Sequence, residues 1–469
     1  MGCFLLFFID KANTKTIKNL TLLTTLITFD ISIVVALCFN PFALNFQMLQ
    51  ELNWLLFNNN QIILAVDGLS ITMILLTTFL MPICILLFWA NSQSNSVWGY
   101  CFAFLTLEFI LLTVFSSLDL LIFYILFEAV LIPMYFIVGF YGSRQRKIRA
   151  AYMLFLYTLV SSILMFISIL FIYLKTGSTN YLLLRQYEFD LYTEYCCWLA
   201  FFSSFAVKMP LMPFHIWLPE AHCEAPTAGS VLLAGILLKL GGYGFLRYSI
   251  TLFTTASAYF VPLIFILSVF GVLYASLTTL QQVDLKKIVA YSSVGHMGLV
   301  TIGIFSLTIQ GIAGSIVLML AHGISSSALF ICIGFLYERY KTRIIKYYSG
   351  IMNTMPLFSI CFIVFNMANL GLPLTSNFIG EFLVITGCFP VNNWVALLAG
   401  TSMVISAGYS LWLCNRVLFG NFKYYSVIFM KDLTRLESFI LLPFVILTFI
   451  IGLYPEFVFV FIRSYLLNF

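Results

Sequence analysis

Apolar residues run along this chain in long blocks that are separated by short polar segments. A helix needs roughly 20 apolar residues to cross a hydrocarbon core about 30 Å thick. Thirteen blocks reach or approach that length, and we expect each of them to be a membrane-spanning helix. The predicted spans cover residues 19–39, 67–89, 97–116, 118–140, 150–174, 195–218, 224–249, 257–280, 287–308, 311–337, 353–389, 392–415 and 437–462.

The segment ahead of the first block, CFLLFFI (residues 3–9), is too short to cross a bilayer and lacks the cleavage site of a signal peptide. We expect it to be half a span or an end that dips into the membrane, so the total is 13 or 14 spans. The apolar runs do not alternate with polar residues, which excludes a β-barrel. The predicted fold is therefore an all-α polytopic membrane protein.

Composition supports this prediction and excludes several functions. The chain is 62% hydrophobic and 9% charged, whereas a soluble domain carries about 25% charged residues. KLGGYG (residues 239–244) has the wrong order for a P-loop, so ATP hydrolysis is not expected. The 11 cysteines form no CxxC pair and no cluster at metal spacing, which argues against a metal or iron–sulfur site. We expect no nucleic-acid partner.

The basic residues give the orientation. One set of alternate loops holds 17 of the 23 Lys and Arg residues, among them the segment GSRQRKIR (142–149), Lys286, Arg343 and Lys423, and the other set holds four, including Arg247. Because basic loops stay on the cytoplasmic or matrix side, this asymmetry supports the span count and places the richer set on that side. The basic loop at 142–149 also suits contact with lipid headgroups, and anionic lipids such as cardiolipin are expected partners.

Four charged residues stand out well inside predicted spans, where an unpaired charge costs about 2.5 to 3.5 kcal/mol. They are Glu128, Lys208, Lys239 and Glu381. Structural ion pairs between helices would explain them singly, but buried pairs are rarely better for stability than apolar packing. A row of ionisable groups at membrane depth more often marks a path for ions or protons, and we favour that interpretation.

The chain has four histidines, and two of them extend this row. His296 and His322 lie near the middle of neighbouring spans and are surrounded by serines. An imidazole can pass a proton through its two nitrogens, so we expect this pair to be a relay rather than ordinary packing. His215 and His222 are interpreted as entry-side or supporting groups, and Glu108, on the span before Glu128, as an alternate or peripheral proton site.

Two spans carry helix-breaking residues beside a charge. Lys208 is followed by Pro210 and Pro213, and Gly371 and Pro373 precede Glu381. A proline lacks the amide donor that continues a helix, and the freed backbone is tolerated in a membrane only where protein or water satisfies it. We expect PEAHCEAP (219–226) to form a turn on the basic side.

The two breaks fall on the fourth member of two successive groups of five spans. An odd number of spans turns the second copy upside down, which is the inverted-repeat architecture of many transporters. The expected organisation is N-terminal peripheral helices at 1–96, a first five-helix unit at 97–250, a second inverted unit at 251–420 and a C-terminal peripheral helix at 421–469.

The longest motifs carry a resemblance. KMPLMPFHIWLPEAHCEAPTAGSVLLAGILLKLGGYG (208–244), DLKKIVAYSSVGHMGLVTIGI (284–304), LMLAHGISSSALF and SNFIGEFL resemble the proton-pumping membrane subunits of respiratory complex I, which are similar in turn to subunits of sodium/proton antiporters. The resemblance covers residues 60 to 420. Two departures are HCEAP in place of the family's usual HVEAP, and the short remnant where the family has a full first span.

The resemblance implies roles for the buried row. It implies that Glu128 pairs with Lys208 and tunes it, that Lys239 is the central proton carrier, and that His296 and His322 link Lys239 to Glu381. It also implies that NADH, FMN, iron–sulfur clusters and ubiquinone bind other subunits, that other membrane-arm subunits of the complex are partners, and that the protein lies in the mitochondrial inner membrane.

Two other functions remain open from the sequence. A stand-alone cation/proton antiporter would carry the same charges and would purify without redox subunits. A membrane scaffold that no longer pumps would also carry them, and neutralising its buried charges would then harm assembly alone.

Overall fold

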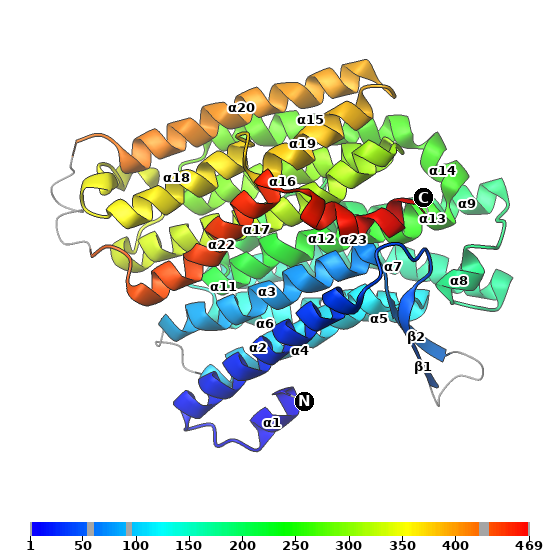
Figure 1. The fold of residues 1–469 in the computed structure, drawn as a ribbon, viewed down its shortest axis with the longest axis horizontal. Helices are drawn as coiled ribbons and strands as arrows, with labels where there is room; N and C mark the ends of the chain where they lie inside the picture. Colours follow the sequence, from blue (N-terminus) through cyan, green and yellow to red (C-terminus); the bar gives the residue numbers. More distant parts are fainter. Residues whose placement is uncertain (1, 54–60, 91–95, 422–430, 468–469) are drawn as a thin grey trace.

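The computed structural model describes residues 2–53, 61–90, 96–421 and 431–467. Long helices lie side by side and nearly parallel in one bundle (Figure 1). Eleven helices of the described part are long and apolar enough to cross a membrane. Lys423, which we counted on the basic side, lies outside the described residues.

The N-terminal part contains helices and one small sheet. Its elements are α1 (Gly2–Phe7), α2 (Thr14–Cys38), β1 (Gln47–Asn53), β2 (Gln61–Val66) and α3 (Gly68–Ala90). The segment that was too short to span forms the six-residue α1, which packs against α2 and α4. β1 and β2 pair antiparallel, and these strands were not predicted at 1–96, where peripheral helices were expected.

The next part of the chain surrounds the first predicted break. Its helices are α4 (Val97–Ser116), α5 (Leu120–Ala129), α6 (Leu131–Tyr141), α7 (Lys147–Thr176), α8 (Tyr181–Leu184), α9 (Leu191–Lys208) and α10 (Trp217–Glu224). α9 ends at Lys208 and α10 begins only at Trp217, so the helix breaks at the prolines as predicted. The predicted turn at 219–226 is wrong in extent, because α10 continues to Glu224 and only Ala225 and Pro226 form the turn.

A deeply buried helical segment follows that turn. It consists of α11 (Thr227–Leu232), the π-helical η1 (Leu233–Leu237), α12 (Leu238–Gly244), a second π-helical segment η2 (Phe245–Ser249) and α13 (Ile250–Leu252). The short α14 (Thr254–Tyr259) comes next, and the spans after it are α15 (Val261–Gln281), α16 (Leu285–Phe305) and α17 (Ile309–Tyr340).

The last part contains the second break. After the short η3 (Ile345–Tyr347) and η4 (Ile351–Asn353) come α18 (Pro356–Leu370), α19 (Ser376–Cys388), α20 (Asn393–Leu418), α22 (Arg435–Leu453) and α23 (Glu456–Leu467). α18 ends in a left-handed Gly371, as a helix C-terminus often does, and Pro373 follows. The span predicted at 437–462 is confirmed as α22 but ends earlier than predicted, because the non-helical Tyr454 and Pro455 separate α22 from α23.

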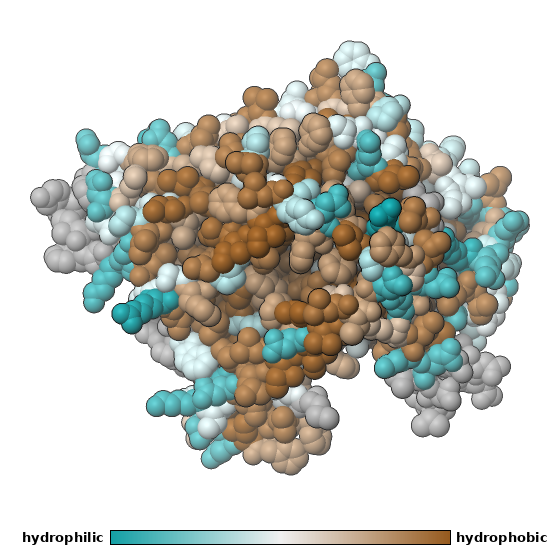
Figure 2. All heavy atoms as spheres, viewed as in Figure 1, coloured by the Kyte–Doolittle hydropathy of each residue, from teal (hydrophilic) through white to brown (hydrophobic). Residues whose placement is uncertain are grey.

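The 13 predicted spans and the 11 long helices agree once the breaks are considered. The two predicted spans absent from the long set are 195–218 and 353–389, and both are divided by the predicted breaks. Brown apolar side chains cover the middle of the molecule, and most teal hydrophilic ones gather toward the two ends of the helices (Figure 2). This distribution fits a bilayer that the helices cross from end to end.

Candidate functional site

Lys239 lies on α12 near the middle of the bundle and has no exposed surface. The π-helical η1 precedes it, and the Leu238 amide there donates to the carbonyl of Leu233, five residues back. Such widened turns are frequent at functional sites because they redirect backbone groups. The Lys239 amine donates to the carbonyl of Ala234, and its Nζ lies 3.0 Å from Nδ1 of His322 on α17.

From His322 the row continues toward the second break. The ring centroids of His322 and His296 are 5.4 Å apart. His296 Nδ1 lies 3.1 Å from Oε1 of Glu381, although the two atoms are not aligned for a hydrogen bond. Nε2 of His296 lies 3.1 Å from Oδ1 of Asn369. Four titratable groups from α12, α17, α16 and α19 thus follow one another through the interior.

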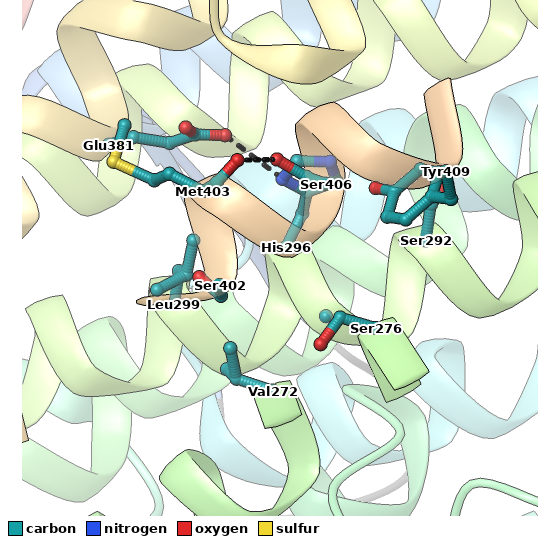
Figure 3. A pocket seen from close by; sticks show the side chains of 11 residues that line it. Val272, Ser276, Ser292, His296, Leu299, Glu381, Ser402, Met403, Ser406 and Tyr409 are labelled. Atoms are coloured by element: carbon teal, nitrogen blue, oxygen red, sulfur yellow. Dashed lines mark hydrogen bonds and ion pairs between the residues drawn. The ribbon is translucent and has the colours of Figure 1, made fainter. Parts of the chain in front are cut away.

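A small polar cavity lies beside the far end of this row. His296 and Glu381 reach toward each other at its edge, and Ser292 and Tyr409 lie next to each other nearby (Figure 3). The cavity has a volume of about 20 Å³, and about 10 to 15 Å³ suffices for one water. Its hydroxyl groups come from α15, α16 and α20. The end of the row at Glu381 therefore adjoins a space that can hold water.

Glu128 and Lys208 lie close together, but not as the expected pair. The Lys208 amine donates to the carbonyl of Phe127 at 2.6 Å and lies over the Phe127 ring. These two described residues form no ion pair within 4 Å, and Oε1 of Glu128 has no hydrogen-bond partner in the protein. α5 ends at Ala129, the residue after Glu128, and α6 begins at Leu131. The reason is that Pro133 lacks the amide that would bind the carbonyl of Ala129.

The three secondary candidates lie in different places. Glu108 on α4 is buried against α2, where the Thr28 hydroxyl donates to it at 2.5 Å. His215 lies in the break between α9 and α10, beside the rings of Tyr274 and Tyr291. His222 on α10 is fully buried and stacks on Phe330, and neither of its ring nitrogens has a hydrogen-bond partner.

Sequence reasoning missed several buried polar residues. Lys286, Arg343 and Arg247 were counted as loop charges, yet each is at most 2% exposed. Asn369 was not singled out, although its amide contacts His296. For Asn369 the sequence offered only one signal, which is a polar amide inside a span directly before the break at Gly371.

Comparison with known proteins adds independent information. Residues 117–406 match the family model described as NADH:quinone oxidoreductase/Mrp antiporter, TM. The chain is 54% identical over 456 residues to NADH-ubiquinone oxidoreductase chain 4 of Chondrus crispus, an alignment that covers 97% of this chain and 92% of the relative.

Solved structures share the fold. A chain of respiratory complex I from Thermus thermophilus with bound NADH superposes with a TM-score of 0.89 at 28% identity, covering 100% of this chain and 96% of the other. A chain of the Mrp complex from Dietzia sp. DQ12-45-1b superposes with a TM-score of 0.83 at 18% identity, covering 97% and 92% of the two chains. The second likeness concerns the fold alone.

Proposed function

Because this chain belongs to the family of membrane subunits shared by NADH:quinone oxidoreductases and Mrp antiporters, we propose that it is the proton-translocating subunit 4 of a mitochondrial complex I membrane arm. It is a multi-pass protein of the mitochondrial inner membrane. It moves protons from the matrix, and quinone reduction elsewhere in the complex drives the movement.

The observation that carries this proposal is the unbroken order of titratable groups from Lys239 to Glu381. Nζ of Lys239 and Nδ1 of His322 are 3.0 Å apart, the centroids of the two imidazole rings are 5.4 Å apart, and Nδ1 of His296 is 3.1 Å from Oε1 of Glu381. A neutral imidazole accepts a proton on one nitrogen and releases one from the other. Protons enter through the first unit to Lys239, cross the two histidines and leave by Glu381 through the inverted second unit.

The Glu128 and Lys208 pair supplies the switch. Opposite charges about 4 Å apart at an effective dielectric of 20 interact by about 4 kcal/mol. Since about 1.4 kcal/mol changes an equilibrium tenfold, closing or opening this pair alters proton occupancy by roughly a thousandfold. Lys208 is bound to the Phe127 carbonyl here. When the pair opens, Lys208 loses its stabilising carboxylate and pushes the proton on Lys239 away.

The wider assembly follows from the same proposal. NADH, FMN, the iron–sulfur clusters and ubiquinone bind other subunits, so this chain is part of the enzyme without holding its redox chemistry. Its neighbours in the membrane arm are the antiporter-like subunits 2 and 5, and anionic lipids such as cardiolipin contact its basic side.

Two variants test the mechanism in the assembled complex, reconstituted in vesicles. Glu128→Gln and Lys239→Ala are expected to lower the number of protons pumped per NADH oxidised. Ser315→Ala on α17, whose hydroxyl binds the carbonyl of Ile312, is the control and should leave this ratio near that of the parent. A full ratio in both test variants would overturn the mechanism.

Purification separates the alternatives. A stand-alone cation/proton antiporter would be recovered without redox subunits, and a scaffold that no longer pumps would show impaired assembly but normal pumping per NADH in the buried-charge variants. The 54% identity to an oxidoreductase chain over nearly the whole length favours the complex I subunit over both.

A further inference from the structure

A second cluster of buried titratable residues lies on the basic side, outside the row from Lys239 to Glu381. Glu224 ends α10, His222 lies half a turn before it, and Lys286 is the second residue of α16. Their side chains are 3%, 0% and 1% exposed. Burying three such groups at one helix junction costs free energy, which suggests that they have a function there.

Hydrogen bonds join the cluster at the turn between α10 and α11. The Lys286 amine donates to the carbonyl of Ala225 at 2.9 Å and lies 3.2 Å from the hydroxyl of Ser230. The Ser230 hydroxyl in turn donates to the carbonyl of His222 at 3.1 Å. Lys286 is thereby fixed at the base of the helix that carries Lys239.

Glu224 and His222 keep polar atoms free. Oε2 of Glu224 and both ring nitrogens of His222 have no hydrogen-bond partner in the protein. Almost all buried polar atoms in folded proteins are hydrogen-bonded. We therefore infer that these atoms bind a partner transiently. A proton and the water that delivers it are partners of this kind.

A cavity of about 680 Å³ opens beside this cluster. It is lined by Ala225, Thr227, Lys286 and Arg343, and its other walls are the basic-side ends of α3, α4, α6 and α17. A bulk water takes up about 30 Å³, so the space can hold several waters. The cavity thus reaches from the matrix-facing end of the bundle to the residue that follows Glu224.

His222 interacts electrostatically both with this cluster and with the row from Lys239 to Glu381. The charges of Lys286 and Lys239 both act on His222, and His222 in turn interacts with His322. Within the cluster, His222 is the residue that interacts electrostatically with both Lys286 and Lys239.

We propose that Glu224, His222 and Lys286 form the port through which a matrix proton reaches Lys239, a step that rests on the proposed pumping function. Glu224 takes a proton from water at Oε2 and passes it through water to one nitrogen of His222. The other nitrogen releases a proton, again through water, to the neutral amine of Lys239. Only O–H and N–H bonds form and break, and no electron is transferred.

Lys286 is a positioning residue in this port. Its charge repels a proton held on His222 and so favours the forward direction. Other charged and titratable groups surround the port from every neighbouring element and belong to its electrostatic setting. They are Glu220 and Cys223 on α10, Asp284 and Lys287 at the start of α16, Glu338 on α17, Lys341 and Arg343 after α17, Arg144 before α7 and Lys147 at its start.

The test compares Glu224→Gln with Glu220→Gln in the assembled complex in vesicles. Glu220 lies one turn earlier on the same helix, is 37% exposed and pairs with Lys287, so its loss controls for a charge removed from α10. We expect Glu224→Gln to lower the rate of coupled pumping by about tenfold. This factor corresponds to a change of one pKa unit in the proton affinity of the port. The defect should grow as the matrix-side pH rises, because fewer protons then reach the port.

Two further variants keep the test decisive. Glu224→Asp restores a carboxylate and should recover much of the rate, whereas a purely structural role would give a loss that is the same at every pH and follows assembly. If Glu224→Gln does not assemble, His222→Gln is measured in its place with the same pH series. A normal, pH-independent pumping rate in the assembled variant overturns the port.

The outcome also separates the port from the proposed function. If Lys239→Ala abolishes pumping while Glu224→Gln leaves it intact at every pH, the port is wrong and the function stands. If Lys239→Ala pumps normally as well, the proposed function itself is wrong.

Discussion

His322 is a close partner of Lys239: its Nδ1 lies 3.0 Å from the lysine amine, deep inside the bundle where neither side chain meets solvent. The two residues are 83 positions apart in the chain. This contact joins α12, which follows the first break, to α17. In the proposed relay, His322 is the first acceptor for a proton that leaves Lys239.

The first prediction concerns this contact. His322→Gln keeps a polar side chain that can bind Lys239 but cannot take up and release a proton. Protons pumped per NADH should fall, while NADH oxidation in leaky vesicles stays near the parental rate. The control is Ser315→Ala on the same helix, whose hydroxyl only binds the carbonyl of Ile312. Equal pumping in His322→Gln and the control would contradict the relay.

The second prediction concerns the orientation of His296. Asn369 Oδ1 lies 3.1 Å from Nε2 of His296 and fixes the ring so that Nδ1 faces Glu381. Removing a hydrogen bond of this kind with Asn369→Leu costs about 0.5 to 1.5 kcal/mol, or roughly two- to tenfold in the population of the correct ring position. Pumping should slow by a similar factor.

Asn369→Asp, which keeps an acceptor oxygen at the same place, should retain most of the pumping rate. If Asn369→Leu and Asn369→Asp prove equally active in vesicles, the amide does not position the histidine.

The third prediction concerns Gly371. This residue has φ of +80°, and a Cβ added there would lie 2.5 Å from Oε2 of Glu381. Gly371→Ala therefore adds about 1 to 2 kcal/mol of backbone strain and also pushes the Glu381 carboxylate away from His296. We expect reduced thermal stability of the complex and reduced pumping per NADH.

Two glycines separate these effects. Gly177→Ala carries the same kind of strain, with φ of +69° and no atom near the added Cβ, and should lower stability alone. Gly408→Ala on α20 meets neither obstacle and should be neutral or stabilising, by up to about 1 kcal/mol. Normal pumping in Gly371→Ala would show that Glu381 tolerates displacement.

The fourth prediction concerns Asp67, which lies just outside α3 and binds the buried Arg247 at 2.6 Å. Burial raises the pKa of Asp67, but the Arg247 charge and the hydrogen bonds from Arg247 and Ser70 outweigh it and hold the pKa below the ordinary 3.8. A carboxyl group whose pKa is lower in the folded state than in the unfolded state stabilises the protein at every pH above the unfolded-state pKa. This stabilisation is lost only as the pH falls through the folded-state pKa. The pair should therefore persist throughout the range from neutral pH to about pH 4.

Asp67→Asn leaves Arg247 buried without its counter-charge, which costs about 3 to 5 kcal/mol. Thermal unfolding of the purified complex should begin at a lower temperature in Asp67→Asn, and the difference from the parent should shrink at strongly acidic pH. A difference that is the same at every pH would indicate a steric effect instead of the ion pair.

The sequence identified most of the spans because each is a local run of apolar residues, and a bilayer accepts such a run only as a helix. It located both breaks because proline and glycine act on their own turn of backbone. It also singled out Lys239, His296, His322 and Glu381, since charge or imidazole inside an apolar block is visible without knowledge of neighbours. The strands at 47–53 and 61–66 and the division at Pro455 were missed, the strands because they are short and mixed in polarity.

The sequence by itself thus determined which residues are costly in a membrane and where the helices break. Only the tertiary structure decided which of them meet. It brought Lys239 to His322, replaced the expected Glu128 and Lys208 pair with a lysine bound to the Phe127 carbonyl, and buried Lys286 and Arg343, which loop counting had assigned to the surface. The physical reason is that hydropathy is a property of each segment, whereas pairing, depth and orientation depend on which helices pack together.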